Sequence, residues 1–308
     1  MKACSFLPAA TNIIYELGLE DYLFGVTFEC PSDKPNLVRS YLEGREYSSK
    51  EIDLIVSRFK SQGRSLYYIN EELLRSISPD VIFTQDVCDV CQIDTGYVHR
   101  GIASLDKEPL LAPLTPHSLN DVYENILTVA KTLGEENRGY KLLASLKKRT
   151  DSIVDSLRAH NAPLRRALLM EWINPIYNCG HWIPFQIAQA GGVDMLSNPS
   201  GYSTITSWDR ILRYDPEVII IAPCGFRIER TIEEFPILIN RPGWDHLTAV
   251  KNAEVFIADG NLFTEPSARL VNGIELLASS LHPTIFRIPT NVKDKVVSYT
   301  DAFTKLRV

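Results

Sequence analysis

The chain has 308 residues, a formal net charge of -6, 45% hydrophobic residues and 23% charged residues. This length accommodates two domains with separate cores, and the composition is that of a folded globular protein rather than a disordered one. Lysine and arginine are scattered, which argues against a nucleic-acid partner. No apolar run reaches the roughly 20 residues of a membrane-spanning helix, so we expect no membrane insertion.

The start of the chain, MKACSFLPAA, is interrupted by Pro8, Asn12 and Glu16 and suits a strand and a first helix better than a signal peptide. We therefore expect a cytoplasmic protein. Six cysteines in a chain of this length do not make a disulfide framework. In a reducing compartment they are free thiols, metal ligands or redox groups.

Residues 1–115 alternate strand-like and helical runs, the pattern of parallel strands joined by helices. We expect strands at 4–7, 22–28 and 81–84, and helices at 11–17 and 71–77. A polar segment over 31–65 contains one short surface helix at 49–59. These elements predict an N-terminal α/β lobe.

Residues 116–160 carry two long helical patterns. Apolar residues at steps of three and four define one helix face from Ser118 to Leu133, and a second pattern runs from about Glu135 to Ala159. At about 1.5 Å per residue, the second helix would extend on the order of 37 Å, about the width of a lobe. We expect a rigid connection between lobes rather than a flexible linker.

The α/β alternation returns in residues 161–283, which predict a C-terminal lobe. Strands are expected at 167–172, 218–222 and 255–258, and helices at 183–190, 208–212 and 267–281. Residues 284–308 are more polar and are expected to form a C-terminal extension.

One phrase occurs in both lobes. Residues 71–84 read EELLRSISPDVIFT and residues 209–222 read DRILRYDPEVIIIA, so Pro79 and Pro216, 137 positions apart, mark the same point. Each copy predicts a helix, a short turn and a buried strand. The fold expected is therefore two similar α/β lobes with parallel sheets, joined by a long backbone helix, with a ligand cleft between the lobes.

Long gapped phrases carry a family resemblance: SFLPAATNIIYELGLEDYLFGVTFEC, ISPDVIFTQDVCDVC, CGHWIPFQIAQAGG, SWDRILRYDPEVIIIAPCGF and RPGWDHLTAVKNAEVFIADG. They resemble the helical-backbone metal receptors, the Fe/B12-type substrate-binding proteins, and within these the vitamin B12 (cobalamin)-binding branch. The resemblance implies a corrinoid or another metal chelate clamped in the cleft. In transport members of the family, it also implies an ABC-type permease as the partner of the exported protein.

In those transport members, one acidic residue on each lobe docks onto arginines of the permease. Counted from the repeated prolines, the corresponding residues are Glu72 and Asp209, the second of which departs from the usual glutamate. Both acids also suit the first turn of a helix, where the helix dipole favours negative charge. Docking and helix stabilisation both remain open for them.

The resemblance also implies ligand contacts. His181 follows a strand and a turn, and in cobalamin binding a histidine can replace the lower axial ligand of cobalt; the alternative is a histidine that hydrogen-bonds near a helix start. Aromatic candidates for packing on the corrin ring are Trp172, Tyr177, Trp182 and Phe226. Asp86 could hydrogen-bond the corrin amides or cap a loop. Trp208 and Trp244 are expected in the core.

Cysteines follow three predicted strands, at the sheet edge where ligands bind. These are Cys30, Cys88 and Cys224, and Cys91 completes a CxxC pair with Cys88. If the lobes close, the four thiols could hold zinc, iron or a cluster. The alternative is that they are reduced thiols that pack as small hydrophobic groups.

No GxSxG, Walker phosphate loop, HExxH or GxGxxG pattern is present. We therefore expect a ligand-binding protein rather than an enzyme. The main alternative is a cytosolic metal-dependent or redox enzyme that uses the four cysteines above. A third is an interaction module whose cleft is filled by side chains.

Overall fold

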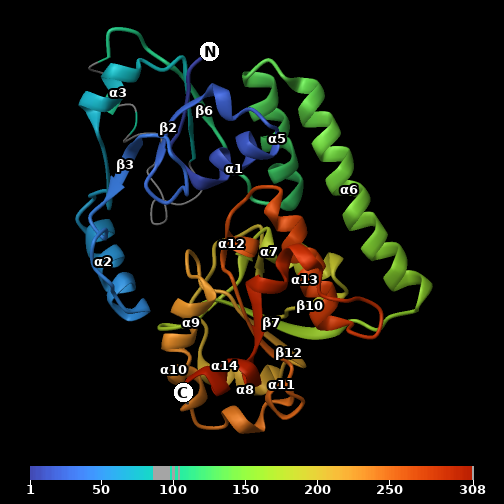
Figure 1. Ribbon diagram of the computed structural model, residues 1–308. Helices are drawn as coiled ribbons and strands as arrows, with labels where there is room; N and C mark the ends of the chain where they lie inside the picture. The colour runs from blue at the N-terminus through green and yellow to red at the C-terminus, as the bar shows by residue number, and fades with distance from the viewer. Residues whose placement is uncertain (86–97, 99–100, 103–104, 307–308) are drawn as a thin grey trace. The chain divides into compact units, whose positions relative to one another are not determined.

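The computed structural model describes residues 1–85, 98, 101–102 and 105–306. The chain divides into two compact units. The first comprises Met1–Tyr47, Glu51–Pro116 and Asn120–Ala144, and the second Ser48–Lys50, His117–Leu119 and Ser145–Val308. Each unit has its own mainly parallel sheet with helices packed on it (Figure 1). The predicted fold class, two α/β lobes with parallel sheets, is confirmed.

The sheet of the first unit has the strand order β4-β3-β2-β1-β5-β6 and is parallel except where β3 meets β4. Its strands are β1 (Ala3–Ser5), β2 (Leu23–Thr27), β3 (Asn36–Ser40), β4 (Tyr67–Ile69), β5 (Val81–Thr84) and β6 (Leu110–Pro113). The helices that run mainly in this unit are α1 (Pro8–Glu16), α2 (Ser49–Ser61), α3 (Glu71–Ile77) and α5 (Leu119–Thr132), with a 3-10 turn η1 (Glu20–Tyr22).

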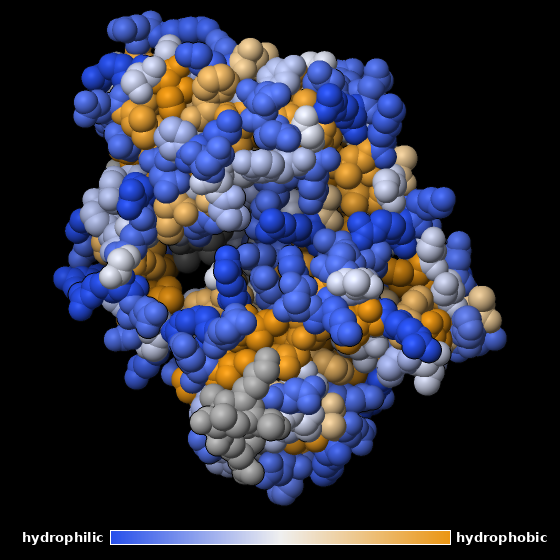
Figure 2. Space-filling view, viewed as in Figure 1, coloured by the Kyte–Doolittle hydropathy of each residue, from blue (hydrophilic) through white to orange (hydrophobic). Residues whose placement is uncertain are grey.

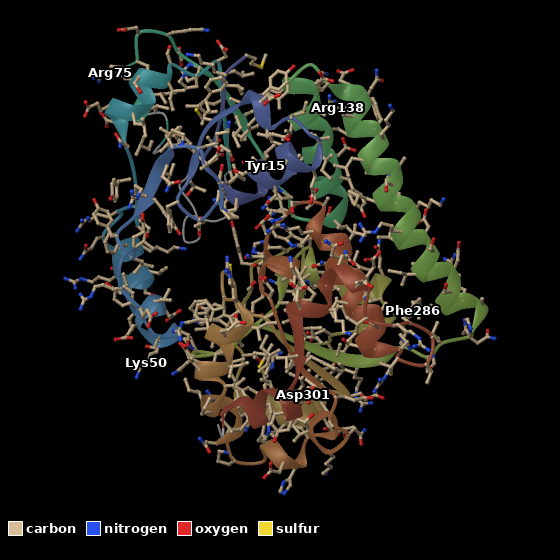
Figure 3. The ribbon with its side chains drawn as sticks, viewed as in Figure 1. Tyr15, Lys50, Arg75, Arg138, Phe286 and Asp301 are labelled. Atoms are coloured by element: carbon tan, nitrogen blue, oxygen red, sulfur yellow. The ribbon has the colours of Figure 1, made fainter. Side chains whose placement is uncertain are left out.

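The helix α6 (Glu136–Ala159) has 24 residues, and the boundary between the units falls within it. In the first unit, the guanidinium of Arg138, labelled in Figure 3, donates to the carbonyl of Gly18 at 2.7 Å, just after α1 ends. In the second unit, Arg149 makes two hydrogen bonds to Glu275 of α13 at 2.8 and 2.7 Å. These charge-assisted bonds hold each part of α6 on its own unit.

The sheet of the second unit has the strand order β10-β7-β12-β13-β14, with β8 paired to β7. Its strands are β7 (Arg165–Trp172), β8 (Tyr177–Asn178), β10 (Gly192–Val193), β12 (Val218–Ile221), β13 (Val255–Ala258) and β14 (Val296–Ser298). In this sheet, β8 pairs antiparallel with β7 and β14 pairs antiparallel with β13, and the other described pairs are parallel. A separate parallel pair consists of β9 (Gly180–His181) and β11 (Asn198–Pro199).

Short helices surround this second sheet. They are α7 (Ile183–Gln189), α8 (Trp208–Tyr214), α9 (Ile228–Glu234), α10 (Pro236–Ile239), α11 (Thr248–Lys251), α12 (Asn261–Thr264), α13 (Arg269–Leu281), α14 (Tyr299–Leu306), and the 3-10 turns η2 (Trp244–His246) and η3 (Thr290–Lys295). Leu168, Met170, Ile219 and Ile221, at alternate positions of β7 and β12, share one core cluster with residues of α8 to α11. Most of the surface shown in Figure 2 is polar, with apolar residues in scattered patches.

The repeated phrase folds in the same way in both units. The helix α3 begins after Asn70, whose side chain accepts a backbone N–H at 3.1 Å, and α8 begins after Ser207, whose hydroxyl accepts one at 3.4 Å. Both helices have seven residues and end at a left-handed residue, Ser78 (φ 50°) and Asp215 (φ 47°). A proline and a wholly buried strand follow in each copy. The predicted helix, turn and strand are confirmed.

Candidate ligand-binding site in the second unit

The candidate site lies at the carboxyl end of β7, the edge of an open α/β sheet where ligands bind. Trp172 ends β7 and pairs with Tyr177 of β8. His181 follows in β9, and Phe226, in the loop after β12, packs on Trp172 with ring centroids 5.0 Å apart. The second unit therefore places these four predicted ligand contacts on the loops that leave the carboxyl ends of β7 and β12.

Two loops meet at this edge and are bonded residue by residue. The N–H of Asn178 donates to the carbonyl of Thr204 at 3.0 Å, and its side-chain oxygen accepts the N–H of Thr204 at 2.7 Å. The N–H of His181 donates to the carbonyl of Gly201 at 2.6 Å. A Cβ atom on Gly180 would lie only 2.5 Å from the backbone nitrogen of Ser203, so only glycine fits between the loops. Segments 178–181 and 198–204 thus form one platform.

His181 stands on this platform in an unusual backbone conformation. Its φ is 52°, and its ring lies 5.3 Å from the ring of Trp182 and 5.5 Å, edge-on, from the ring of Tyr202. The imidazole is half-buried, and its Nδ1 has no hydrogen-bond partner among the described residues. Burial, with a smaller contribution from the charge of His117, lowers the pKa of His181 below its ordinary value. The neutral imidazole, the form that binds metals, is therefore favoured.

Trp172 and Phe226 belong to a closed ring of contacts. The indole N–H of Trp172 donates to the carbonyl of Ser49 at 3.1 Å, and the N–H of Ser49 donates to the carboxylate of Glu234 at 2.7 Å. Arg230 donates to the same carboxylate at 2.6 Å and lies 4.9 Å from the centre of the Phe226 ring. These contacts fix the edges of the two aromatic rings. Glu234 is buried, and its charge is neutralised by Arg230.

Trp182, also expected to contact the ligand, is 5% exposed, and its indole N–H donates to the carbonyl of Phe263 at 2.7 Å. This geometry uses the indole to join α7 to α12. Asp86, Cys88 and Cys91 lie outside the described residues. Their expected roles stay predictions.

The two other predicted metal ligands belong to different units. Cys30 belongs to the first unit, where its buried thiol donates to the hydroxyl of Thr11 at 3.1 Å, whereas Cys224 belongs to the second unit and is half-buried. Burial raises the pKa of Cys4 to about 12 and that of Cys179 well above its usual value, so both are neutral thiols. The part of the chain that the structure describes contains no group of three or more His, Cys, Asp or Glu residues arranged to hold a metal ion.

Comparisons with known proteins agree with this architecture. The family model for periplasmic binding proteins matches residues 69–262, more than half of the chain. The chain belongs to the periplasmic binding protein family. A relative from Bacillus subtilis strain 168, the uncharacterized ABC transporter substrate-binding lipoprotein YvrC, is 23% identical over 294 residues, which span 93% of this chain and 81% of the relative.

Solved periplasmic binding proteins share the fold. A periplasmic heme-binding protein of Pseudomonas aeruginosa superposes with a TM-score of 0.69 at 14% identity, covering 94% of this chain and 96% of its own. The vitamin B12-binding protein BtuF of Vibrio cholerae gives 0.62 at 18% identity, with 92% and 96% covered. A protein of an Fe3+-hydroxamate transport system from Saccharomonospora viridis gives 0.65 at 18% identity, with 91% and 92% covered. At these identities the likeness establishes the fold.

Membership of this family corrects one prediction. We expected a cytoplasmic location, and that expectation is wrong: the matched family is that of periplasmic binding proteins, and YvrC is a lipoprotein. The strand and helix expected at the start of the chain are confirmed as β1 and α1. None of the helices in the described part of the chain has both the length and the apolar content to cross a bilayer.

The two acids expected at a docking surface occupy equivalent places in their units. Glu72 and Asp209 are both the second residue of their seven-residue helices, α3 and α8, and both are exposed. Each thus presents a carboxylate to solvent beside a helix N-terminus, where negative charge is favoured. This arrangement is compatible with helix stabilisation and with docking.

Several residues of the platform were not singled out from the sequence. Tyr202 contacts the ring of His181, Glu171 bonds to Gly180 and Ser203 beside these two residues, and Arg230 with Glu234 completes the ring of contacts at Trp172. Glu171 is the last residue but one of β7, and it interrupts the apolar residues that follow the two arginines at the start of that strand. A charged residue at that point was the available signal, because a charge at the end of a buried strand needs partners.

Proposed function

We propose that this periplasmic binding protein carries a corrinoid of the cobalamin class, held at the carboxyl edge of the second sheet with His181 as the axial ligand of cobalt, and delivers it to an ABC-type permease. The observation that carries the proposal is the half-buried imidazole of His181, whose neutral form is favoured and whose buried Nδ1 has no hydrogen-bond partner in the part of the chain that the structure describes. A neutral imidazole has the lone pair that a metal requires.

Aromatic rings at this edge of the second sheet support a flat ligand. Tyr202 is 60% exposed and meets the imidazole edge-on, and the half-buried Trp172 packs on Phe226. Aromatic faces are the natural contact for a macrocycle. Two family members of the same fold are named as heme-binding and vitamin B12-binding proteins, and both of these ligands are planar metal-bearing macrocycles.

The test is an absorbance titration of the purified protein with aquocobalamin. We expect stoichiometric binding with a shift of the cobalt spectrum, and we expect His181→Ala to abolish the shift and to weaken binding more than tenfold, at least about 1.4 kcal/mol of binding free energy. The matched control is His160→Ala, because His160 is exposed just after α6 and its Nδ1 bonds to the carbonyl of Ser156 in that helix.

Two results would contradict parts of this proposal. An unchanged spectral shift in His181→Ala would retain the corrinoid and remove the histidine from its coordination. Tight binding of heme or of a ferric hydroxamate, with no binding of aquocobalamin, would replace the proposed ligand class.

Delivery to a permease is tested through the two exposed acids. We expect Glu72→Lys and Asp209→Lys each to reduce uptake of radiolabelled cyanocobalamin by cells about tenfold or more, because like charges at a docking surface repel. The affinity of the purified variants for aquocobalamin should equal that of the wild type. Glu71→Lys and Arg210→Glu change exposed neighbours on the same two helices and serve as controls. Wild-type uptake by both test variants would contradict the docking role.

A further inference from the structure

Glu171 is a buried carboxylate that bonds to residues beside the proposed ligand contacts and is not itself one of those contacts. Glu171, next to the end of β7, is only 9% exposed. Its Oε2 accepts a hydrogen bond from the N–H of Gly180 at 3.0 Å and another from the hydroxyl of Ser203. Carboxylate acceptors make stronger hydrogen bonds than neutral ones, and a buried carboxylate is stable only with such donors.

The two donors belong to different loops, and each precedes or follows a proposed ligand contact. Gly180 directly precedes His181, and Ser203 directly follows Tyr202. One carboxylate oxygen therefore joins the loop that carries the imidazole to the loop that carries the phenol ring. The edge-on contact of these two rings, with centroids 5.5 Å apart, depends on how the loops are held together.

The backbone at His181 makes this dependence stronger. For a residue other than glycine, a φ of 52° costs conformational free energy, and this backbone conformation persists only where the surrounding structure imposes it. The direct contact of Gly180 with the backbone of Ser203 leaves no room for the loops to move closer together. The bonds to Glu171 join the loops at Gly180 and Ser203, in addition to the Asn178–Thr204 and His181–Gly201 bonds described above.

We propose that Glu171 is a positioning residue: by binding Gly180 and Ser203 together, it sets the imidazole of His181 and the ring of Tyr202 in the geometry that receives the ligand. The inference rests on the function proposed above. Partners that orient metal ligands typically change metal affinity by about 10–100-fold when they are removed. We expect an effect in this range although Glu171 contacts no ligand atom.

The experiment compares Ser203→Ala, which removes one donor, with Ser203→Thr, which retains the hydroxyl, and adds Glu171→Gln. For each full-length variant we would record the imidazole resonances of His181 without ligand, and then the affinity and cobalt spectrum with aquocobalamin. We expect Ser203→Ala and Glu171→Gln to move the His181 resonances and to weaken binding by about tenfold or more. Ser203→Thr should leave the His181 resonances and the binding affinity close to those of the wild type. Glu229→Gln, at an exposed carboxylate of α9, is the matched control.

His181 resonances that stay at their wild-type positions in Ser203→Ala would overturn the inference, even if that variant had lost thermal stability. If Glu171→Gln does not fold, the Ser203 pair still decides. Absence of corrinoid binding by the wild-type protein would instead refute the proposed function. In that case, the ligand-free resonances would still show whether Glu171 and Ser203 hold His181 in place.

Discussion

Replacing Trp244 with alanine is expected to lower the free energy of unfolding of the second unit by about 3–5 kcal/mol. The indole is 1% exposed and packs edge-on against Phe235, with ring centroids 5.8 Å apart, and stacks on Trp208 at 6.2 Å. Alanine would lose this apolar burial and leave a cavity that the neighbouring rings cannot fill without moving. Urea denaturation followed by circular dichroism measures the loss.

Two matched variants separate the cavity from other causes. Trp244→Phe keeps most of the buried volume and should cost clearly less, since the indole Nε1 of Trp244 has no hydrogen-bond partner among the described residues. Trp208→Ala removes the half-buried partner of the stacked pair and should also cost less. A loss below about 1 kcal/mol for Trp244→Ala would contradict the packing described for this core.

The same core explains where the end of the chain belongs. An extension was expected over residues 284–308 because the segment is polar. In the structure, β14 pairs with β13, the ring of Tyr299 lies 6.3 Å from that of Trp244, and Ala302 is fully buried. A few apolar residues are enough to attach this segment, because each packs on the core of the second unit. Composition averaged over a segment does not reveal such contacts.

Helices long enough to show the apolar period over many turns, and the phrase that occurs in both units, were predictable from sequence. The helices α5 and α6 begin and end within one residue of the predicted bounds, because their apolar residues repeat over many turns. By contrast, α1 begins at Pro8 rather than Thr11, since proline is favoured in the first turn of a helix. The four-residue helices α10, α11 and α12 were not predicted, because one turn is too short to show a period.

The candidate site was predictable only in part, for a related reason. His181 and Trp172 were proposed as candidates because their residue types can bind a metal macrocycle. Glu171 and Ser203 were not, because the role inferred for them depends on a contact between residues 32 positions apart. A single sequence does not contain that distance. The close fit of Gly180 is likewise a property of the folded loops.

The buried carboxyl of Asp194 gives the largest expected dependence of the unfolding free energy on pH. Asp194 is 8% exposed, and its carboxyl accepts the N–H of Leu196 at 2.9 Å and that of Leu169 at 3.3 Å. The thiol of Cys179 donates to the same group at 3.6 Å. Burial outweighs these hydrogen bonds and raises the pKa of Asp194 from 3.8 to about 6. The folded protein therefore favours the protonated carboxyl.

The direction of the effect follows from this difference. Well below pH 3.8 the carboxyl is protonated in both states and costs nothing. Between pH 3.8 and about 6 the unfolded chain ionises while the folded protein still holds the proton, so stability falls; above about pH 6 both states are ionised and the penalty stays constant. At about 1.4 kcal/mol for each pH unit between the two pKa values, the folded state loses about 3 kcal/mol over this range. Asp194→Asn lacks the titrating group, so its unfolding free energy relative to wild type should rise by up to about 3 kcal/mol between pH 4 and pH 7.

Urea denaturation of both proteins at intervals from pH 4 to pH 7 gives this difference directly. The contributions of all other titrating groups cancel between wild type and Asp194→Asn, including that of His282, whose pKa is lowered by burial. Asp209→Asn, at an exposed carboxylate of the same unit, controls for the change in net charge. A constant difference between Asp194→Asn and wild type would mean that the Asp194 carboxyl titrates near its ordinary pKa. Its burial beneath the loop that carries His181 would then impose no penalty on the ionised form.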